Sequence, residues 1–309
     1  MAMGKYISKR ILLLIPVIIG ISLFIFFILS IAPGDPAALI LGADATEADI
    51  QAKRVEMGLD KPILVQYINY MAGVLKGDFG KSWYNGYDVM EEFLNRLPNT
   101  LQLGLMAMAI SAVVGIPLGV IAAVKQYGVF DYMTLVFAMI FSSIPTFWFG
   151  LMAQIYLCIK LGLLPATGGG SFIHLILPAI TLSAAQLASQ VRMTRTSMLE
   201  VMKQDYVRTA RAKGCSERRI VVRHVLRNGL LPVVTSLGGS FATIIGGSTV
   251  TESVFAIPGT SNMLINAVKV RDIPVVMGVL IVIAAFVGVV NLLVDILYTV
   301  IDPRVKLGT

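Results

Sequence analysis

The chain has 309 residues, of which 14% are charged and 56% hydrophobic, and its formal net charge is +7. An ordinary soluble domain carries about 25% charged residues, so this chain lacks the charge to cover a water-facing surface, and two soluble domains are excluded. The positive charge does not indicate nucleic-acid binding, because the cytoplasmic loops of membrane proteins collect Lys and Arg.

The first predicted element is an uncharged run at residues 11–32, which follows Lys5, Lys9 and Arg10. As a helix, the run is long enough to cross about 30 Å of hydrocarbon. A cleaved signal peptide is the alternative. Its apolar region would be about 7 to 15 residues long and would end at a small-residue cleavage site, for which "SIAPGDPA" is a poor match. We interpret residues 1–32 as a cytoplasmic N-terminus and an uncleaved first transmembrane helix.

Residues 33–98 form a long polar segment, which we expect to be an extracellular or periplasmic subdomain with one or two short helices, such as 46–57. The string "GDFGKS" within it resembles part of a phosphate-binding loop. Such a loop needs a glycine five positions before Gly80, and this chain has Leu75 there. No nucleotide site is predicted in this segment.

Five further apolar runs lack charged side chains; they lie at residues 101–124, 132–159, 175–191, 229–250 and 275–294. With the first run they predict an all-α integral membrane protein with six transmembrane helices, a core at 99–300 and a cytoplasmic tail at 301–309. The spacing of Gly115 and Gly119 lets helix backbones approach closely. Pro145 removes a backbone hydrogen bond and predicts a kink in the third run. The polar Gln186 and Gln190 are costly against lipid, so we expect them to face other helices or a translocation path.

The distribution of Lys and Arg predicts the orientation, because these residues are enriched in short cytoplasmic loops. With six spans and both termini cytoplasmic, the inside segments hold 16 of the 25 Lys and Arg residues. The outside segments hold nine, and six of these lie in the long 33–98 segment together with ten acids. Ten of the inside residues lie between positions 192 and 228. This basic block is therefore predicted to lie inside the cell.

Gly214 divides the block, because a glycine after a helical run commonly ends the helix, and Ser216 is a good residue to start the next one. The sequence predicts two short helices. On the second, the arginines recur every four residues, opposite two valines, which is typical of a helix at a membrane surface. The stripe consists of Arg219, Arg223 and Arg227, and the opposite side carries Val221 and Val225.

On the first short helix, Val207, Ala210 and Gly214 are spaced to give a face without bulk. Polar and basic residues flank this face: Tyr206, Arg208, Arg211 and Lys213. A narrow ridge of this kind can enter a groove on another protein. The alternative is an ordinary positive-inside loop without a docking role, and the residues by themselves leave both interpretations open.

The two cysteines, Cys158 and Cys215, form no CxxC pair, and His174 and His224 stand far apart in the sequence. No disulfide and no metal site is therefore expected. We also identify no catalytic residue and no cofactor-binding residue.

The string "YVRTARAKGCSERRIVVRHVLRNGLLPVV", residues 206–234, resembles the cytoplasmic coupling segment of ABC importer permeases in the dipeptide/oligopeptide branch. Further stretches resemble the same branch in the same order, over nearly the whole chain: "PGDPA", "GLDKPILVQY", "GDFGKS", "RLPNTLQL", "SIPTFW" and "TESVFAIPGTSNMLINAV". Many permeases have Glu-Ala-Ala ahead of the glycine, where this chain has Arg208, Thr209 and Ala210 before Gly214. The role of that glutamate therefore does not transfer.

The resemblance implies a type I ABC importer permease fold in the cell membrane, and a chain that performs no chemistry itself. Its implied partners are a second permease in a heterodimer, two cytoplasmic ABC ATPases that bind ATP, and an external substrate-binding protein. A coupling segment at 203–228 would contact the ATPases, chiefly through Asp205, Tyr206, Val207, Arg208, Ala210, Arg211 and Gly214.

Candidates for the translocation path are Gln186, Gln190 and Glu252, whose alternative role is hydrogen bonding between helices. The implied cargo is di- or oligopeptides, and relatives of this branch also carry nickel chelates or glutathione. An ion-coupled secondary transporter is the main rival class. It would place ionisable groups near the middle of the bilayer, where the six apolar runs have none.

Overall fold

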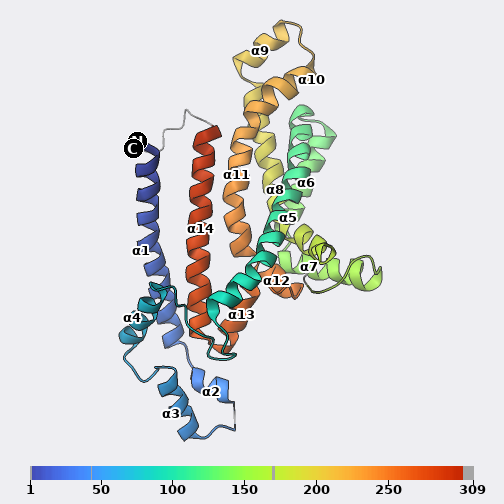
Figure 1. The fold of residues 1–309 in the computed structure, drawn as a ribbon. Coiled ribbons are helices and arrows are strands. Elements are labelled where there is room, and N and C mark those ends of the chain that lie inside the picture. Colours follow the sequence, from blue (N-terminus) through green and yellow to red (C-terminus); the bar gives the residue numbers. More distant parts are fainter. Residues whose placement is uncertain (1, 43, 169–170, 302–309) are drawn as a thin grey trace. The chain divides into compact units, whose positions relative to one another are not determined.

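A computed structural model describes residues 2–42, 44–168 and 171–301, and the predicted tail therefore lies outside the described residues from position 302 onward. Over the described ranges the chain is helical, and its one β-bridge pairs Lys81 with Asp88. Figure 1 follows the helices in chain order. They are α1 (Ala2–Ile31), α2 (Pro36–Leu41), α3 (Glu47–Glu56), α4 (Ile63–Val74), α5 (Val89–Val124), α6 (Val129–Ser143), α7 (Thr146–Ala153), η1 (Gln154–Lys160), α8 (Phe172–Met202), α9 (Asp205–Ala212), α10 (Glu217–Ile220), η2 (Val221–Val225), α11 (Leu226–Gly247), α12 (Thr249–Val254), α13 (Thr260–Val270) and α14 (Ile273–Ile301).

The chain forms two compact units. The first combines Met1–Thr100 with Pro258–Val289, and the second combines Leu101–Ile257 with Val290–Thr309. Helices α5 and α14 each begin in the first unit and end in the second. The boundary at Thr100 falls close to the predicted end of the 33–98 segment.

Five helices within the described ranges are long and apolar enough to cross a membrane, or six if the pair α6 and α7–η1 counts as one span. That pair is bent by 97°. The chain leaves the helical conformation at Ile144, whose ψ is 125°, because Pro145 disfavours a helical residue before it. The predicted distortion at Pro145 is confirmed, but instead of a kink within one helix it is a sharp corner between two helices.

Two helices extend beyond their predicted apolar runs. Helix α5 begins at Val89, ahead of the predicted start at 101 and inside the segment predicted to run to residue 98. Its first turns carry charges such as Glu91 and Glu92, which a search for uncharged runs passes over. Helix α8 likewise continues from the predicted end at 191 to Met202, through Arg192 and Arg195.

The first unit contains α1, the 33–98 segment, α13 and most of α14. A side chain at Gly288 would overlap Leu14, so α1 and α14 are in close contact. Among its described residues, the 33–98 segment contains three short helices, where one or two were expected. The predicted helix at 46–57 is confirmed as α3, which Thr46 caps by accepting from the N–H of Asp49, while the Asp49 carboxylate accepts from the N–H of Thr46. The Thr46 hydroxyl also donates to the Asp49 carboxylate at 2.6 Å, and this hydrogen bond holds the pKa of Asp49 below its ordinary value.

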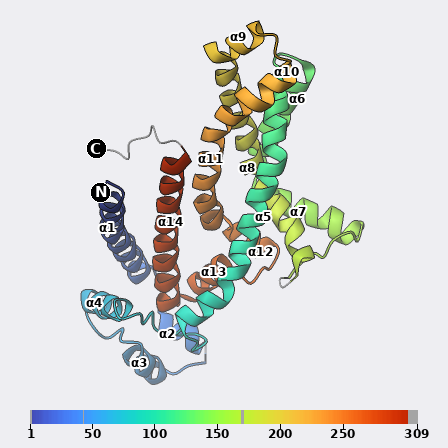
Figure 2. The ribbon, with the colours of Figure 1, turned by 45° about the horizontal axis from the view of Figure 1, so that its top comes forward.

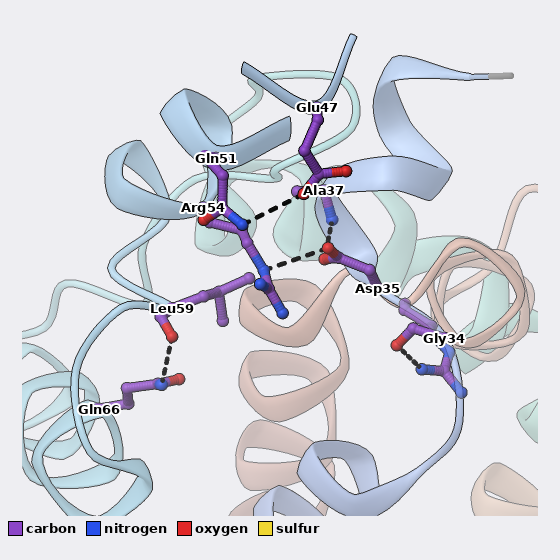
Figure 3. A network of polar contacts seen from close by, with 9 residues as sticks. Gly34, Asp35, Ala37, Glu47, Gln51, Arg54, Leu59 and Gln66 are labelled. Atoms are coloured by element: carbon purple, nitrogen blue, oxygen red, sulfur yellow. Dashed lines mark hydrogen bonds and ion pairs between the residues drawn. The ribbon is translucent and has the colours of Figure 1, made fainter. Parts of the chain in front are cut away.

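Polar contacts join α2 to α3 in the first unit (Figure 3). Asp35 caps α2 by accepting from the N–H of Ala37 at 3.0 Å, and its other oxygen lies 3.1 Å from Nε of Arg54 on α3. Arg271, just before α14, donates to the carbonyl oxygens of Ala32 and Gly34. These contacts fix the segment that leaves α1 against the start of α14.

In the second unit, α8 packs along α6, α7 and α11 (Figures 1 and 2). Its contact with α5 depends on the two glycines singled out above. A Cβ at Gly119 would lie 2.6 Å from Cβ of Thr194, and one at Gly115 would lie 3.1 Å from Cβ of Gln190. The predicted close approach at Gly115 and Gly119 is therefore confirmed, and α8 is the helix that approaches.

Candidate functional site

The segment 203–228 stands at one end of α8 and α11, where Figure 2 shows α9 and α10 side by side. Helix α8 ends at Met202, and only Lys203 and Gln204 separate it from α9. Both linking residues keep their N–H groups bonded to the last turn of α8, at the carbonyls of Glu200 and Val201. The connection is therefore short and hydrogen-bonded, so α9 and the end of α8 are expected to move together.

Gly214 ends the first short helix, as predicted. Helix α9 stops at Ala212, and Gly214 has a φ of 76°, a conformation that glycine adopts without strain. Ser216 then starts the next helix as its N-cap residue, which is also as predicted.

Val207 and Ala210 point into the protein. Val207 is fully buried and Ala210 is 7% exposed. They pack in a core cluster with Ala123 of α5, Met198 of α8 and Val225 of η2. At these two residues, the small face predicted to enter a groove on another protein is covered by the chain's own helices. An apolar stripe on an amphipathic helix reveals burial, but not which neighbour provides it.

The outer face of α9 is polar and basic. Asp205 and Arg208 are almost fully exposed, at 99% and 78% of their side-chain surface. Tyr206 and Arg211 are also exposed, as is Gly214, whose missing side chain would meet no atom within 4 Å. Five of the seven residues predicted for coupling therefore lie on an accessible surface, which we call the outer face of α9: Asp205, Tyr206, Arg208, Arg211 and Gly214.

Two side-chain contacts tie α9 to the helix that follows. Arg211 donates to both carboxylate oxygens of Glu217, at 2.7 and 3.1 Å, and this contact raises the pKa of the Arg211 guanidinium. Asn228 donates to the hydroxyl oxygen of Tyr206 at 3.0 Å. The sequence did not identify Glu217 and Asn228 as partners of Arg211 and Tyr206. These side chains follow the turn after α9, and no local pattern shows which of them contact α9.

The arginine stripe is confirmed. Arg219, Arg223 and Arg227 are exposed, while Val225 is buried and Val221 is half-buried. The prediction of a separate surface helix is wrong, however, because residues 217–247 run as one continuous helical span through the π-helical turn η2. No glycine or proline interrupts residues 217–228, so nothing in the sequence ends the helix there.

The three candidates for a translocation path occupy different environments. Gln186 is half-buried. Gln190 is 1% exposed against Gly115, and neither of its amide atoms has a hydrogen-bond partner within the described chain. Glu252, on α12, is fully buried and accepts from the hydroxyl of Ser248 at 3.0 Å. Gln190 and Glu252 therefore face the inside of the second unit.

Over the described ranges, no group of three or more His, Cys, Asp and Glu side chains is arranged to hold a metal ion.

Two protein-family models match the chain, one over its N-terminal part and one over its C-terminal part. Residues 115–307 match the family described as binding-protein-dependent transport system inner membrane component. Residues 3–104 match the family described as the N-terminal part of such a membrane component. Together the two matches cover nearly the whole chain.

Among similar proteins is the dipeptide transport system permease protein DppB of Escherichia coli (strain K12), which is 40% identical over 98% of this chain and 99% of its own length. The oligopeptide transport system permease protein AppB of Bacillus subtilis (strain 168) is 40% identical over 98% of this chain and its full length. The probable peptide ABC transporter permease protein y4tP of Sinorhizobium fredii is 41% identical over the same share of both chains.

A solved chain of the MetNI methionine ABC transporter, in an inward-facing conformation, superposes with a TM-score of 0.60. The match covers 69% of this chain and 98% of that one, at 18% sequence identity. At this identity the likeness shows the fold alone, and it is the fold that the sequence predicted. With two family models covering nearly all residues and relatives at 40% identity over the full length, this chain belongs to the family of binding-protein-dependent transport system inner membrane components.

Proposed function

We propose that this chain is a transmembrane permease subunit of an ATP-driven importer and forms half of the translocation path for di- or oligopeptides. The observation that carries the substrate class is its 40% identity, over nearly the full length of both chains, to permeases named for dipeptide and oligopeptide transport. The chain would perform no chemistry, and it would sit in the cell membrane as a multi-pass protein.

The proposed complex contains three further kinds of protein. A second, similar permease would complete the path as a heterodimer, two cytoplasmic ABC ATPases would bind and hydrolyse ATP, and an external binding protein would deliver the substrate. The family description, which names binding-protein-dependent transport, supports the last of these. The accessible outer face of α9 supports contact with the ATPases, because it offers exposed charged groups on a helix that is fixed to α8.

The proposed coupling runs through α9. ATP would close the two ATPases, and the outer face of α9, held in a groove on one of them, would follow. Because α9 continues directly from α8 and is tied to the next helix by Arg211 and Asn228, its displacement would move both long helices. Rigid-body rocking of this kind changes the side on which a central cavity opens. Gln186, Gln190 and Glu252 stay the candidates for the path.

Both termini are proposed to be cytoplasmic, with the 33–98 segment outside the cell and the core at 99–300 crossing the membrane. This topology requires the bent pair α6 and α7–η1 to cross as one span. The charge distribution supports it, because the ten Lys and Arg residues between 192 and 228 then lie inside.

The experiment is purification from the native membrane, followed by reconstitution into liposomes with the co-purified subunits and the external binding protein. We expect two ATPases and a second permease to co-purify, and a radiolabelled dipeptide to enter only with ATP. Uptake of glutathione or a nickel chelate, but of no peptide, would overturn the substrate class. Uptake driven by an ion gradient without ATP would overturn the importer itself.

A further inference from the structure

A buried ion pair joins α6 to α8 in the second unit. Arg195 on α8 donates from Nε and Nη2 to the two carboxylate oxygens of Asp131 on α6, at 2.6 and 2.8 Å. Asp131 is 1% exposed, and it also accepts from the N–H of Tyr127 at 3.0 Å. Three donors therefore hold this carboxylate.

This geometry fixes the two helices relative to each other. A guanidinium that bonds both carboxylate oxygens lies in their plane, so the pair restricts orientation as well as distance. Asp131 lies in the first turn of α6, where the helix dipole favours a negative charge. The pair is also largely withdrawn from solvent, so water competes little for its hydrogen bonds.

The same turn of α8 contacts two other helices. Thr194 packs against Gly119 of α5, where a Cβ would lie 2.6 Å away. Ser197 donates from its hydroxyl to the carbonyl of Gly229 on α11, at 2.7 Å. We call residues 194–198 of α8 the hub, because within five residues they bond or pack against α5, α6 and α11.

The hub lies close to the coupling helix. It ends four residues before the end of α8 at Met202, and α9 begins three residues after that. Met198 of the hub also packs in the core cluster that contains Val207 and Ala210, the buried residues of α9. A displacement of α9 therefore reaches the hub both along the backbone and through direct packing.

We propose that the Asp131–Arg195 ion pair is a positioning device that makes α6 follow α8 when α9 moves. The inference rests on the proposed function, since it assumes that ATPase partners move α9. Helix α6 has no covalent route of comparable length to α9, because the chain between them passes through α7, η1 and α8. Besides the packing of α6 along α8, the ion pair adds a direct and oriented polar contact between these two helices.

Distance measurements between spin labels at Val129 on α6 and Thr209 on α9 test the proposal, since both positions are exposed. The labelled chain, with Cys158 and Cys215 replaced by alanine, is studied in the complete purified complex in lipid nanodiscs. We expect the distance distribution of the otherwise unchanged chain to stay the same when ATP and vanadate are added, because both helices move as one body.

The main variant removes both charges together, Asp131→Leu with Arg195→Met, because losing one partner would leave a buried, unpaired charge that endangers folding. We expect it to gain an ATP-dependent shift in the distance and to lose peptide uptake while ATP hydrolysis continues. The exchange variant, Asp131→Arg with Arg195→Asp, should recover part of the uptake. Arg192→Gln, an exposed arginine on the same helix, is the matched control and should behave like the unchanged chain.

A distance shift in the unchanged chain, or a double variant indistinguishable from it, would overturn the proposal. Absence of ATPase subunits from the purified complex would instead count against the proposed function. In that case the distance distributions measured without nucleotide test the ion pair. A broader distribution in the double variant than in the unchanged chain supports the proposed link between α6 and α8, and an equal width contradicts it.

Discussion

Ser82 donates a hydrogen bond of 2.5 Å to the carboxylate of Asp272, although 190 positions separate the two residues. The same carboxylate accepts from the N–H groups of Trp83 at 3.1 Å and Tyr84 at 3.4 Å. Asp272 is 2% exposed, and a charge at that depth needs such donors. One side chain thus fixes the turn before α5 against the start of α14 within the first unit.

Replacing Asp272 with alanine should destabilise the first unit by about 3 kcal/mol, because one hydroxyl and two backbone N–H groups lose a buried acceptor. The measurement is the thermal unfolding midpoint of the purified chain in detergent. Asp60→Ala removes the same side chain at an exposed position and should leave the midpoint unchanged. Equal midpoints for the two variants would show that the contact contributes nothing.

Gly119→Ala should loosen the packing of α5 on α8. The new Cβ would lie 2.6 Å from Cβ of Thr194 and 2.7 Å from the carbonyl oxygen of Val191, and that backbone oxygen cannot rotate away. Overpacking of this kind costs about 1–3 kcal/mol. Gly246→Ala is the control, since a Cβ there meets no atom within 4 Å and alanine favours the helix. A Gly119 variant as stable as the Gly246 variant would contradict the close contact.

Neighbouring substitutions on α9 should have opposite consequences for folding. Val207→Asp places a carboxylate in an apolar core cluster, and we expect the amount of folded chain in the membrane to fall sharply. Arg208→Asp changes a side chain that is 78% exposed and should leave that amount unchanged. Comparison of the monodisperse fraction after detergent extraction checks both, and a reversed order would mean that α9 is turned the other way.

The bond between Asn228 and Tyr206 should steady α9. Tyr206→Phe removes the acceptor, Asn228→Ala removes the donor, and each should cost about 1 kcal/mol or less because the contact is exposed. Backbone hydrogen exchange of residues 205–212 should be faster in each single variant than in the unchanged chain. In the double variant it should be no faster than in the single variants, because both substitutions remove the same bond. Rates that multiply in the double variant would indicate that the two side chains act independently.

Features set by one residue and its near neighbours could be predicted from the sequence. Pro145 predicts a kink because it removes a backbone hydrogen bond, and the structure has a 97° bend there. Gly214 predicts a helix end for a similarly local reason, and Thr46 predicts a helix start. The repeated glycines at 115 and 119 predict a close helix contact, although not with which helix.

Features that depend on distant residues could not be predicted in this way. Asp131 and Arg195 lie 64 positions apart, so no local pattern connects them. The apolar stripe of Val207 and Ala210 predicts burial but not its cover, because α5, α8 and the helix after the turn provide that cover by tertiary packing. The early start of α5 at Val89 was missed because its first turns are charged and contain Pro98.

Photo-crosslinking is the most direct test of the proposed contact between the outer face of α9 and a partner ATPase. A benzophenone amino acid replaces Arg208 in the complete complex purified from membranes, and a second preparation carries it at Tyr132, an exposed position on α6. We expect an adduct with an ATPase subunit from position 208 and none from position 132. A complex that contains the ATPase but yields no adduct from position 208 would contradict it.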